Sequence, residues 1–133
     1  MLRQRELAKP WRLGRLYLTS LRTLLEGKRE ESLAVCEELM QATFRDPEGM
    51  YYLARQLSYL GEETRALDML SSTIDNGFFC HQAMLRDPWL DSVRARPEFT
   101  ALLNKAHQLQ LEALTAFLAG NGAALLGIHS EGY

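Results

Sequence analysis

Side chains that could do acid–base, nucleophilic or metal chemistry are few in this chain and widely spaced. His81, His107 and His129 lie far apart, and no nucleophile or metal ligand accompanies any of them in a motif. Cys80 and His81 are adjacent, so on a helix they would point in different directions. Residues 120–122, Gly-Asn-Gly, follow a predicted helix, whereas a phosphate-binding loop precedes one. We therefore expect no catalytic residue, no metal site and no cofactor, and predict that the chain is not an enzyme.

Tyrosines, leucines and an arginine at helical spacing offer a different chemistry, the recognition of another protein. Tyr and Arg dominate interface hot spots because each combines a large contact area with a polar end. By this compositional bias Tyr51 and Arg55 are the favoured candidates. The alternative interpretation is that the tyrosines are half-buried packing residues whose hydroxyl groups reach the surface.

The elements that would position these residues are all helices, because apolar residues recur every three or four positions in each long stretch. Pro10 marks the start of the first long helix, after a short segment 2–9, and Gly27 ends it. Asp46-Pro47 begins another helix, because Asp caps the first-turn amides and Pro needs no amide partner there. The expected helices cover about residues 10–26, 30–44, 47–60, 63–75, 78–86 and 97–119.

A period of 34 residues runs through the middle of the chain. Residues 13–46 align without a gap with residues 47–80, which superposes Tyr17 on Tyr51, Gly27 on Gly61, Leu33 on Leu67 and Phe44 on Phe78. Helix–turn–helix repeats of this length bury their apolar faces by stacking on one another. Residues 81–119 break the period and are expected to cap the stack. In this unit Asp87-Pro88 is the predicted helix start, and Trp89 and Leu90 are the predicted core anchors.

Composition and length are those of one globular domain. The chain has 133 residues, of which 47% are hydrophobic and 24% charged. No stretch approaches the roughly 18 uninterrupted apolar residues of a membrane helix, and residues 1–6 lack the apolar run of a secretory signal. Cys36 and Cys80 have no metal-ligand spacing. We expect two reduced thiols in a cytoplasmic protein that contacts no membrane, with a disulfide as the less favoured alternative.

Residues 13–80 resemble two tetratricopeptide repeats. The segments Gly77–Cys80, Arg86–Asp91 and Arg94–Phe99 are similar to the closing part of such regions at the C-termini of bacterial multidomain regulators. The resemblance implies an all-α fold, a right-handed superhelix of helical hairpins in repeats 13–46 and 47–80, with a capping unit over 81–119. From the chain length and the Gly-Asn-Gly sequence that ends the last helix, we expect a single domain over residues 1–122 with a flexible tail over 123–133. In this family the first helix of each repeat lines a concave groove that holds a peptide or a partner helix. By the same register, the residues that would face or border the groove are Tyr17, Leu21, Leu24, Tyr51, Tyr52, Arg55 and Tyr59.

Charge is unevenly spread along the chain. Residues 1–29 carry eight basic and two acidic side chains, and the remainder carries seven basic and fifteen acidic ones. We predict a non-catalytic scaffold whose concave groove binds a protein or peptide partner. The first alternative is a structural unit that forms a homodimer, or a regulatory tail of a larger signalling protein, with the apolar side chains of Leu2, Leu7 and Trp11 covered. A less favoured alternative is nucleic-acid binding through the basic N-terminal helices.

Overall fold

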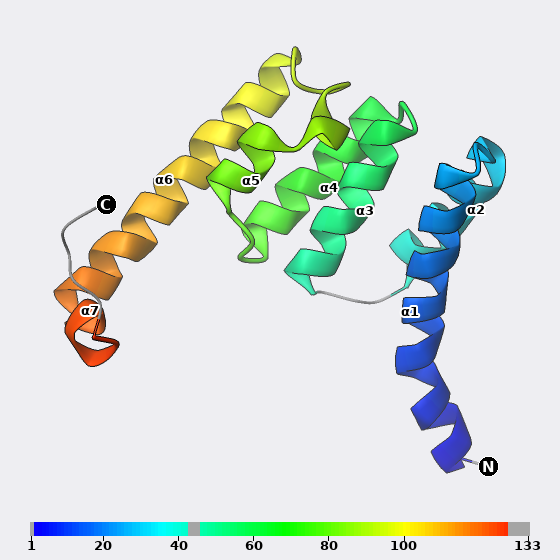
Figure 1. Ribbon diagram of the computed structural model, residues 1–133, viewed down its shortest axis with the longest axis horizontal. Helices are drawn as coiled ribbons and strands as arrows, with labels where there is room; N and C mark the ends of the chain where they lie inside the picture. The colour runs from blue at the N-terminus through cyan, green and yellow to red at the C-terminus, as the bar shows by residue number, and fades with distance from the viewer. Residues whose placement is uncertain (1, 43–45, 128–133) are drawn as a thin grey trace.

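The computed structural model describes the backbone of residues 2–42 and 46–127, and side chains from residue 11 onward within those ranges except that of residue 123. The fold is all-α, and the described residues contain no strand. The helices are α1 (Leu2–Leu25), α2 (Arg29–Gln41), α3 (Pro47–Tyr59), α4 (Glu63–Asp75), α5 (His81–Arg86), the 3₁₀ helix η1 (Pro88–Leu90), α6 (Pro97–Ala119) and α7 (Gly122–Leu125). They form an arch, with α1–α2 at one end, α3–α4 in the middle and α5–α7 at the other end (Figure 1). No described helix combines the length and the apolarity needed to cross a membrane.

Glycine turns close the two hairpins in the same way, as the sequence predicted. Gly27 and Gly61 both have positive φ, +76° and +82°. In the first turn the Lys28 amide donates to the carbonyl of Thr23, and in the second the Glu62 amide donates to that of Leu57. These bonds satisfy carbonyls that the helix ends would otherwise leave unpaired. Two turns 34 residues apart thus have the same backbone geometry.

We expect Gly61→Val to lower the free energy of unfolding by about 1 kcal/mol or more. A β-branched side chain is strained at positive φ, although nothing lies within 4 Å of the position its Cβ would take. The matched control is Gly14→Ala, since Gly14 lies inside helix α1, also with open space around it, and alanine there should stabilise by up to about 1 kcal/mol. Chemical denaturation followed by circular dichroism measures both. Equal unfolding midpoints for Gly61→Val and wild type would contradict the turn assignment.

Small residues allow the paired helices to approach closely. Ser20 and Ser32 are fully buried between α1 and α2, where the Ser32 hydroxyl donates to the Ser20 carbonyl at 2.8 Å. Ala54 and Ala66 are equally buried in the second hairpin. Around them a core cluster of leucines and other apolar residues excludes water, and its fully buried members include Leu39, Leu53, Leu57 and Leu70. In the 34-residue period Ser20 aligns with Ala54 and Ser32 with Ala66, so the positions where the paired helices approach closely hold small residues in both hairpins.

Helix starts follow the local signals. The Asp46 carboxylate accepts a hydrogen bond from the Gly49 amide at 3.2 Å, with Pro47 in the first helical position. Pro97 begins α6 in the same position. The predicted bounds of α4 are confirmed, and so is the end of α6 before Gly120. Each of these signals depends on residues within one turn of the helix boundary, so the boundary can be predicted from the local sequence.

Several predicted boundaries were wrong. Helix α1 is continuous from Leu2 through Pro10, because a proline removes one backbone hydrogen bond without necessarily ending a helix. Helix α2 ends at Gln41 with Ala42 extended, which is earlier than predicted, and Phe44 lies outside the described residues. Helix α5 begins at His81 instead of residue 78.

The segment that was expected to be a flexible tail begins within the short helix α7. Asn121 adopts a left-handed conformation (φ +58°) that reverses the chain after α6, and α7 follows it. A Cβ at Gly122 would lie 2.3 Å from the Phe117 ring, so only glycine allows this close packing. Of the segment 123–133 predicted to be flexible, residues 123–125 are therefore helical, and residues 128–133 lie outside the described ones.

The 3₁₀ helix η1 joins the last unit to α3. The Ser92 hydroxyl donates to the Ser58 carbonyl at 2.7 Å, and the two hydroxyl oxygens lie 2.8 Å apart. Arg94 donates to the carbonyls of Leu85 and Asp87 and so holds the segment between α5 and α6. Leu90 is fully buried, as predicted for a core anchor. Trp89 was predicted to be a second core anchor, but it is only partly buried.

Candidate functional site

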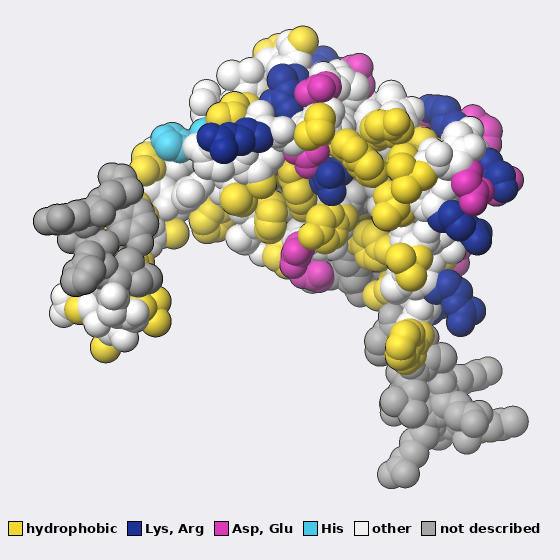
Figure 2. All heavy atoms as spheres, viewed as in Figure 1, with side chains coloured by type: hydrophobic (Ala, Val, Ile, Leu, Met, Phe, Trp, Pro, Cys, Tyr) yellow, Lys and Arg dark blue, Asp and Glu magenta, His cyan; other side chains and the backbone are white. Residues whose placement is uncertain are grey.

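A groove of about 700 Å³ lies on the inner side of the arch, between α1, α3 and η1. Its lining is formed by Tyr17, Leu18, Leu21, Leu25, Asp46, Glu48, Gly49, Tyr52, Arg55, Gln56 and Trp89. Apolar side chains gather on this inner face (Figure 2). The floor and both walls are therefore mainly apolar and aromatic, with the acidic residues Asp46 and Glu48 at the N-terminal end of α3.

Helix α1 supplies one wall, and a hydrogen bond joins it to α3. The Tyr17 hydroxyl donates to the Gly49 carbonyl at 2.7 Å, across the base of the groove. Leu18 and Leu25, on the groove side of α1, remain 70% and 67% exposed. Leucines at this exposure lose the stabilisation that burial would give, roughly 1.5–3 kcal/mol each. An apolar partner that covered them would recover part of it.

Aromatic and cationic side chains of α3 and η1 form the other wall. The Arg55 guanidinium stacks on the Trp89 ring, with its Cζ 4.7 Å from the ring centroid, and lies 5.9 Å from that of Tyr52. The Tyr59 ring packs at 5.0 Å on the outer side of Trp89. The Tyr52 hydroxyl donates to Glu48 at 2.9 Å. Such stacks hold the side chains in place before any partner binds.

Beneath this wall, Asp87 joins three elements. Its carboxylate accepts hydrogen bonds from the Tyr51 hydroxyl at 2.7 Å and from the Trp89 amide at 3.0 Å. The same carboxylate forms an ion pair with Arg55, whose Nε lies 2.5 Å from Oδ2. The Asp87 side chain is 8% exposed and that of Arg55 is 27% exposed. Asp87 was predicted to be only a helix cap, but it also orients the arginine of the groove.

Buried hydroxyl and thiol groups stay protonated at neutral pH. Burial raises the pKa of Tyr17 and of Tyr51, and the nearby carboxylates of Asp46 and Asp87 respectively add to these shifts. Both tyrosines therefore act as hydrogen-bond donors. Burial also raises the pKa of Cys36 to about 11, so its thiol is a poor nucleophile. Cys36 and Cys80 are both free thiols.

The structure brings together four of the seven predicted site residues. Tyr17, Leu21, Tyr52 and Arg55 line the groove. Tyr59 is 58% exposed but stands behind Trp89, outside the lining. Leu24 and Tyr51 are each only 5% exposed, so neither offers its side chain to a partner. Tyr51 is a packing residue in the structure, because its ring stacks on Phe78 at 4.7 Å and its hydroxyl donates to the largely buried Asp87 carboxylate instead of reaching the surface.

Seven of the eleven lining residues were missed by the sequence reasoning, and the apolar and aromatic ones among them are Leu18, Leu25 and Trp89. Leu18 and Leu25 each follow another apolar residue of α1, Trp11 and Leu18 respectively, by seven positions, and that spacing was a usable signal. Trp89 gave no such signal, since an aromatic residue after Asp-Pro fits a core as well as a surface.

Two histidines that are distant in sequence meet in space. The rings of His81 and His107 lie 4.6 Å apart between α5 and α6, beside a smaller cavity of about 410 Å³. The expectation that the histidines do not converge was therefore wrong for this pair. A third ligand is missing nearby, because the part of the chain that the structure describes holds no group of three or more His, Cys, Asp or Glu side chains placed to bind a metal.

Comparisons with protein-family models, curated proteins and solved structures find no match to this chain.

Proposed function

We propose that the chain is a non-catalytic protein-interaction module, and that the groove between α1, α3 and η1 binds a segment of a partner protein. The observation that carries the proposal is the lining itself. Exposed leucines stand on one wall, and a stacked Tyr–Arg–Trp wall faces them. Binding sites combine an apolar surface with a few polar groups of fixed orientation, and hot spots are rich in Tyr, Trp and Arg.

The proposal includes the finer fold assignment. We infer that the two hairpins are tetratricopeptide-like repeats in a right-handed superhelix with α6 as its cap, in a cytoplasmic protein of bacterial type. Support comes from the 34-residue correspondence of the two glycine turns and of the buried small residues. A homodimer in which the groove of one copy holds the other is the alternative function, since the exposed leucines would be covered equally well.

A peptide-display selection on the folded chain tests the proposal. Selected peptides should bind wild type and lose at least about 2 kcal/mol, roughly 30-fold in Kd, on a Leu18→Ala/Tyr52→Ala variant. These two positions are 70% and 43% exposed, so their truncation should leave the fold intact. Tyr51 and Arg55 are unsuitable because both bind Asp87.

The control is Asp68→Ala on α4, an exposed side chain outside the groove lining. Binding curves from fluorescence anisotropy and the circular dichroism spectrum of each variant are compared. Peptides that bind the groove variant as tightly as they bind wild type and Asp68→Ala would place the binding surface elsewhere.

A further inference from the structure

A straight apolar seam runs along α1 beyond the groove. We define the α1 seam as Trp11, Leu18, Leu21 and Leu25. Trp11, Leu18 and Leu25 are 78%, 70% and 67% exposed and follow one another at intervals of seven residues, with Leu21 between the last two. Side chains seven apart lie almost in line on a helix, and this is the spacing at which a second helix packs in a coiled coil. At a rise of about 1.5 Å per residue, the seam from Trp11 to Leu25 is about 21 Å long, and it fits a partner helix of that length.

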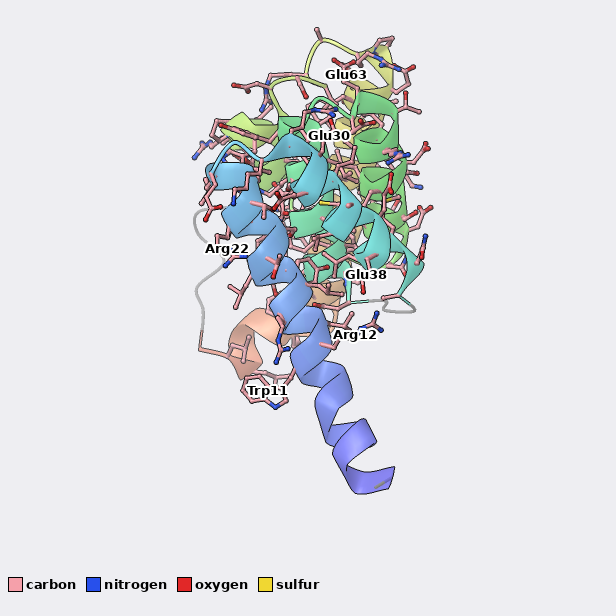
Figure 3. All side chains as sticks on the ribbon, turned by 90° about the vertical axis from the view of Figure 1, so that its right-hand side faces the viewer. Trp11, Arg12, Arg22, Glu30, Glu38 and Glu63 are labelled. Atoms are coloured by element: carbon pink, nitrogen blue, oxygen red, sulfur yellow. The ribbon has the colours of Figure 1, made fainter. Side chains whose placement is uncertain are left out.

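The margin of the seam is basic. Arg15 and Arg22 are exposed and come four residues after Trp11 and Leu18, which places both on one edge of the seam. Trp11 and Arg22 project from the same side of α1, and Arg12 projects from the opposite side, toward Glu38 (Figure 3). Arg12 donates to Glu38 at 2.7 Å. Among the described residues, Arg22 pairs with Glu26 at the long distance of 3.9 Å, and so it keeps donors for a partner.

The opposite rim of the groove carries the opposite charge. Asp46 and Glu48 stand at the N-terminal end of α3, and their carboxylates already accept hydrogen bonds from the Gly49 amide and the Tyr52 hydroxyl. A partner helix with carboxylates along one margin only can direct them toward Arg15 and Arg22 and keep its neutral margin toward α3. A partner helix whose acidic margin lies on its other side can bind in the opposite direction, and its carboxylates then also face Arg15 and Arg22.

The same charges disfavour pairing of α1 with α1 of a second copy. In an antiparallel pair the residues that follow each seam position by four face one another, so Arg15 and Arg22 would meet the arginines of the other copy. In a parallel pair they would face the positions of Tyr17 and Leu24, which pack into the core of their own chain. A helix of a different sequence has neither obstacle.

We propose that the α1 seam binds an amphipathic helix of a partner protein whose apolar stripe is edged on one side by Asp or Glu. This inference rests on the proposed function, because the seam is one wall of the same groove. Leu18, Leu21 and Leu25 contact the apolar stripe, Trp11 extends the contact past the groove, and Arg15 and Arg22 select the acidic margin.

Two synthetic helices of about 21 residues, three heptads, test the inference. Both carry leucine at the first and fourth heptad positions and glutamine along one margin. The other margin is glutamate in the first peptide and lysine in its twin. The glutamate helix should bind the full chain at least about tenfold more tightly than its twin, and less tightly as salt rises, since exposed charges are screened. Tryptophan emission, from Trp11 on the seam and Trp89 in the groove, should shift to shorter wavelength on binding.

Charge reversal on α1 supplies the matched variant. Arg15→Glu/Arg22→Glu should invert the preference between the two peptides. Arg65→Glu/Arg86→Glu, an equal charge change at exposed positions outside the groove, should leave it unchanged. Circular dichroism verifies that both variants are folded.

Equal affinity of wild type for the two helices would overturn the acidic-margin inference and leave groove binding itself in place. Absence of binding by either helix up to millimolar concentration would overturn the helical partner, while the peptide selection above decides groove function separately. The wild-type chain could instead self-associate, with Leu18→Glu abolishing the association and the associated form failing to bind the glutamate helix. That result would assign the seam to a second copy of the chain.

Discussion

Asp87→Ala is expected to lower the free energy of unfolding by about 3–5 kcal/mol, the cost of breaking a largely buried ion pair by removing one partner. The substitution leaves the guanidinium of Arg55, whose side chain is 27% exposed, without its carboxylate. It also removes the acceptor of the Tyr51 hydroxyl and of the Trp89 amide. Three elements, α3, η1 and the turn before η1, lose a common contact. Urea denaturation followed by circular dichroism measures the loss.

Two further variants separate the ion pair from the hydrogen bonds. Tyr51→Phe removes only one hydroxyl, so it should cost about 1.5–3 kcal/mol, the value for a hydrogen bond to a charged acceptor. Asp87→Ala/Arg55→Ala removes both charges and should be less destabilised than Asp87→Ala alone, because no unpaired cation remains. A loss below about 1 kcal/mol for Asp87→Ala would show that Asp87 is an ordinary exposed cap.

Leu90→Ala is expected to cost about 2–5 kcal/mol, while substitution of its neighbour Trp89 costs less despite the larger side chain. Leu90 is fully buried in the core cluster, so its truncation leaves a cavity. Trp89 is only partly buried, and its ring contacts Arg55 and Tyr59 at the edge of the groove. We expect Trp89→Ala to cost about 1–2 kcal/mol and to weaken peptide binding.

The same denaturation experiment compares the two variants, and the selected peptides measure the effect on binding. A larger stability loss for Trp89→Ala than for Leu90→Ala would restore Trp89 as a core anchor and remove it from the groove wall. Retained peptide affinity in Trp89→Ala, with Leu18→Ala/Tyr52→Ala still defective, would confine the binding surface to α1 and α3.

Correct sequence predictions are those that depend on short stretches of chain. Asp46-Pro47, Pro97 and Gly61 mark helix boundaries because their caps and turns involve amides and carbonyls only a few residues away. The prediction of a helix start at Pro10 was wrong because it, too, used only the local sequence. Whether a helix continues past a proline depends on the balance between one lost hydrogen bond and the contacts of the whole helix.

The individual site residues were only partly predictable. Tyr52 and Tyr51 are adjacent and chemically alike, yet one lines the groove and the other stacks on Phe78 above Asp87. The difference comes from which face of α3 meets η1, a contact between segments more than 30 residues apart. His81 and His107 illustrate the same point, since their meeting depends on how α5 packs on α6.

By itself, then, the sequence determined the helical content, most helix boundaries and the two matched hairpin turns, because hydrophobic period and capping are local properties. The tertiary structure alone decided which apolar and aromatic side chains remain exposed. Contacts such as Tyr17 to Gly49, Ser92 to Ser58 and Tyr51 to Asp87 set the spacing of α1, α3 and η1. That spacing leaves Leu18 and Leu25 uncovered and stacks Arg55 on Trp89 across from them. A groove is a property of the distance between elements, and the apolar period of each helix does not encode that distance.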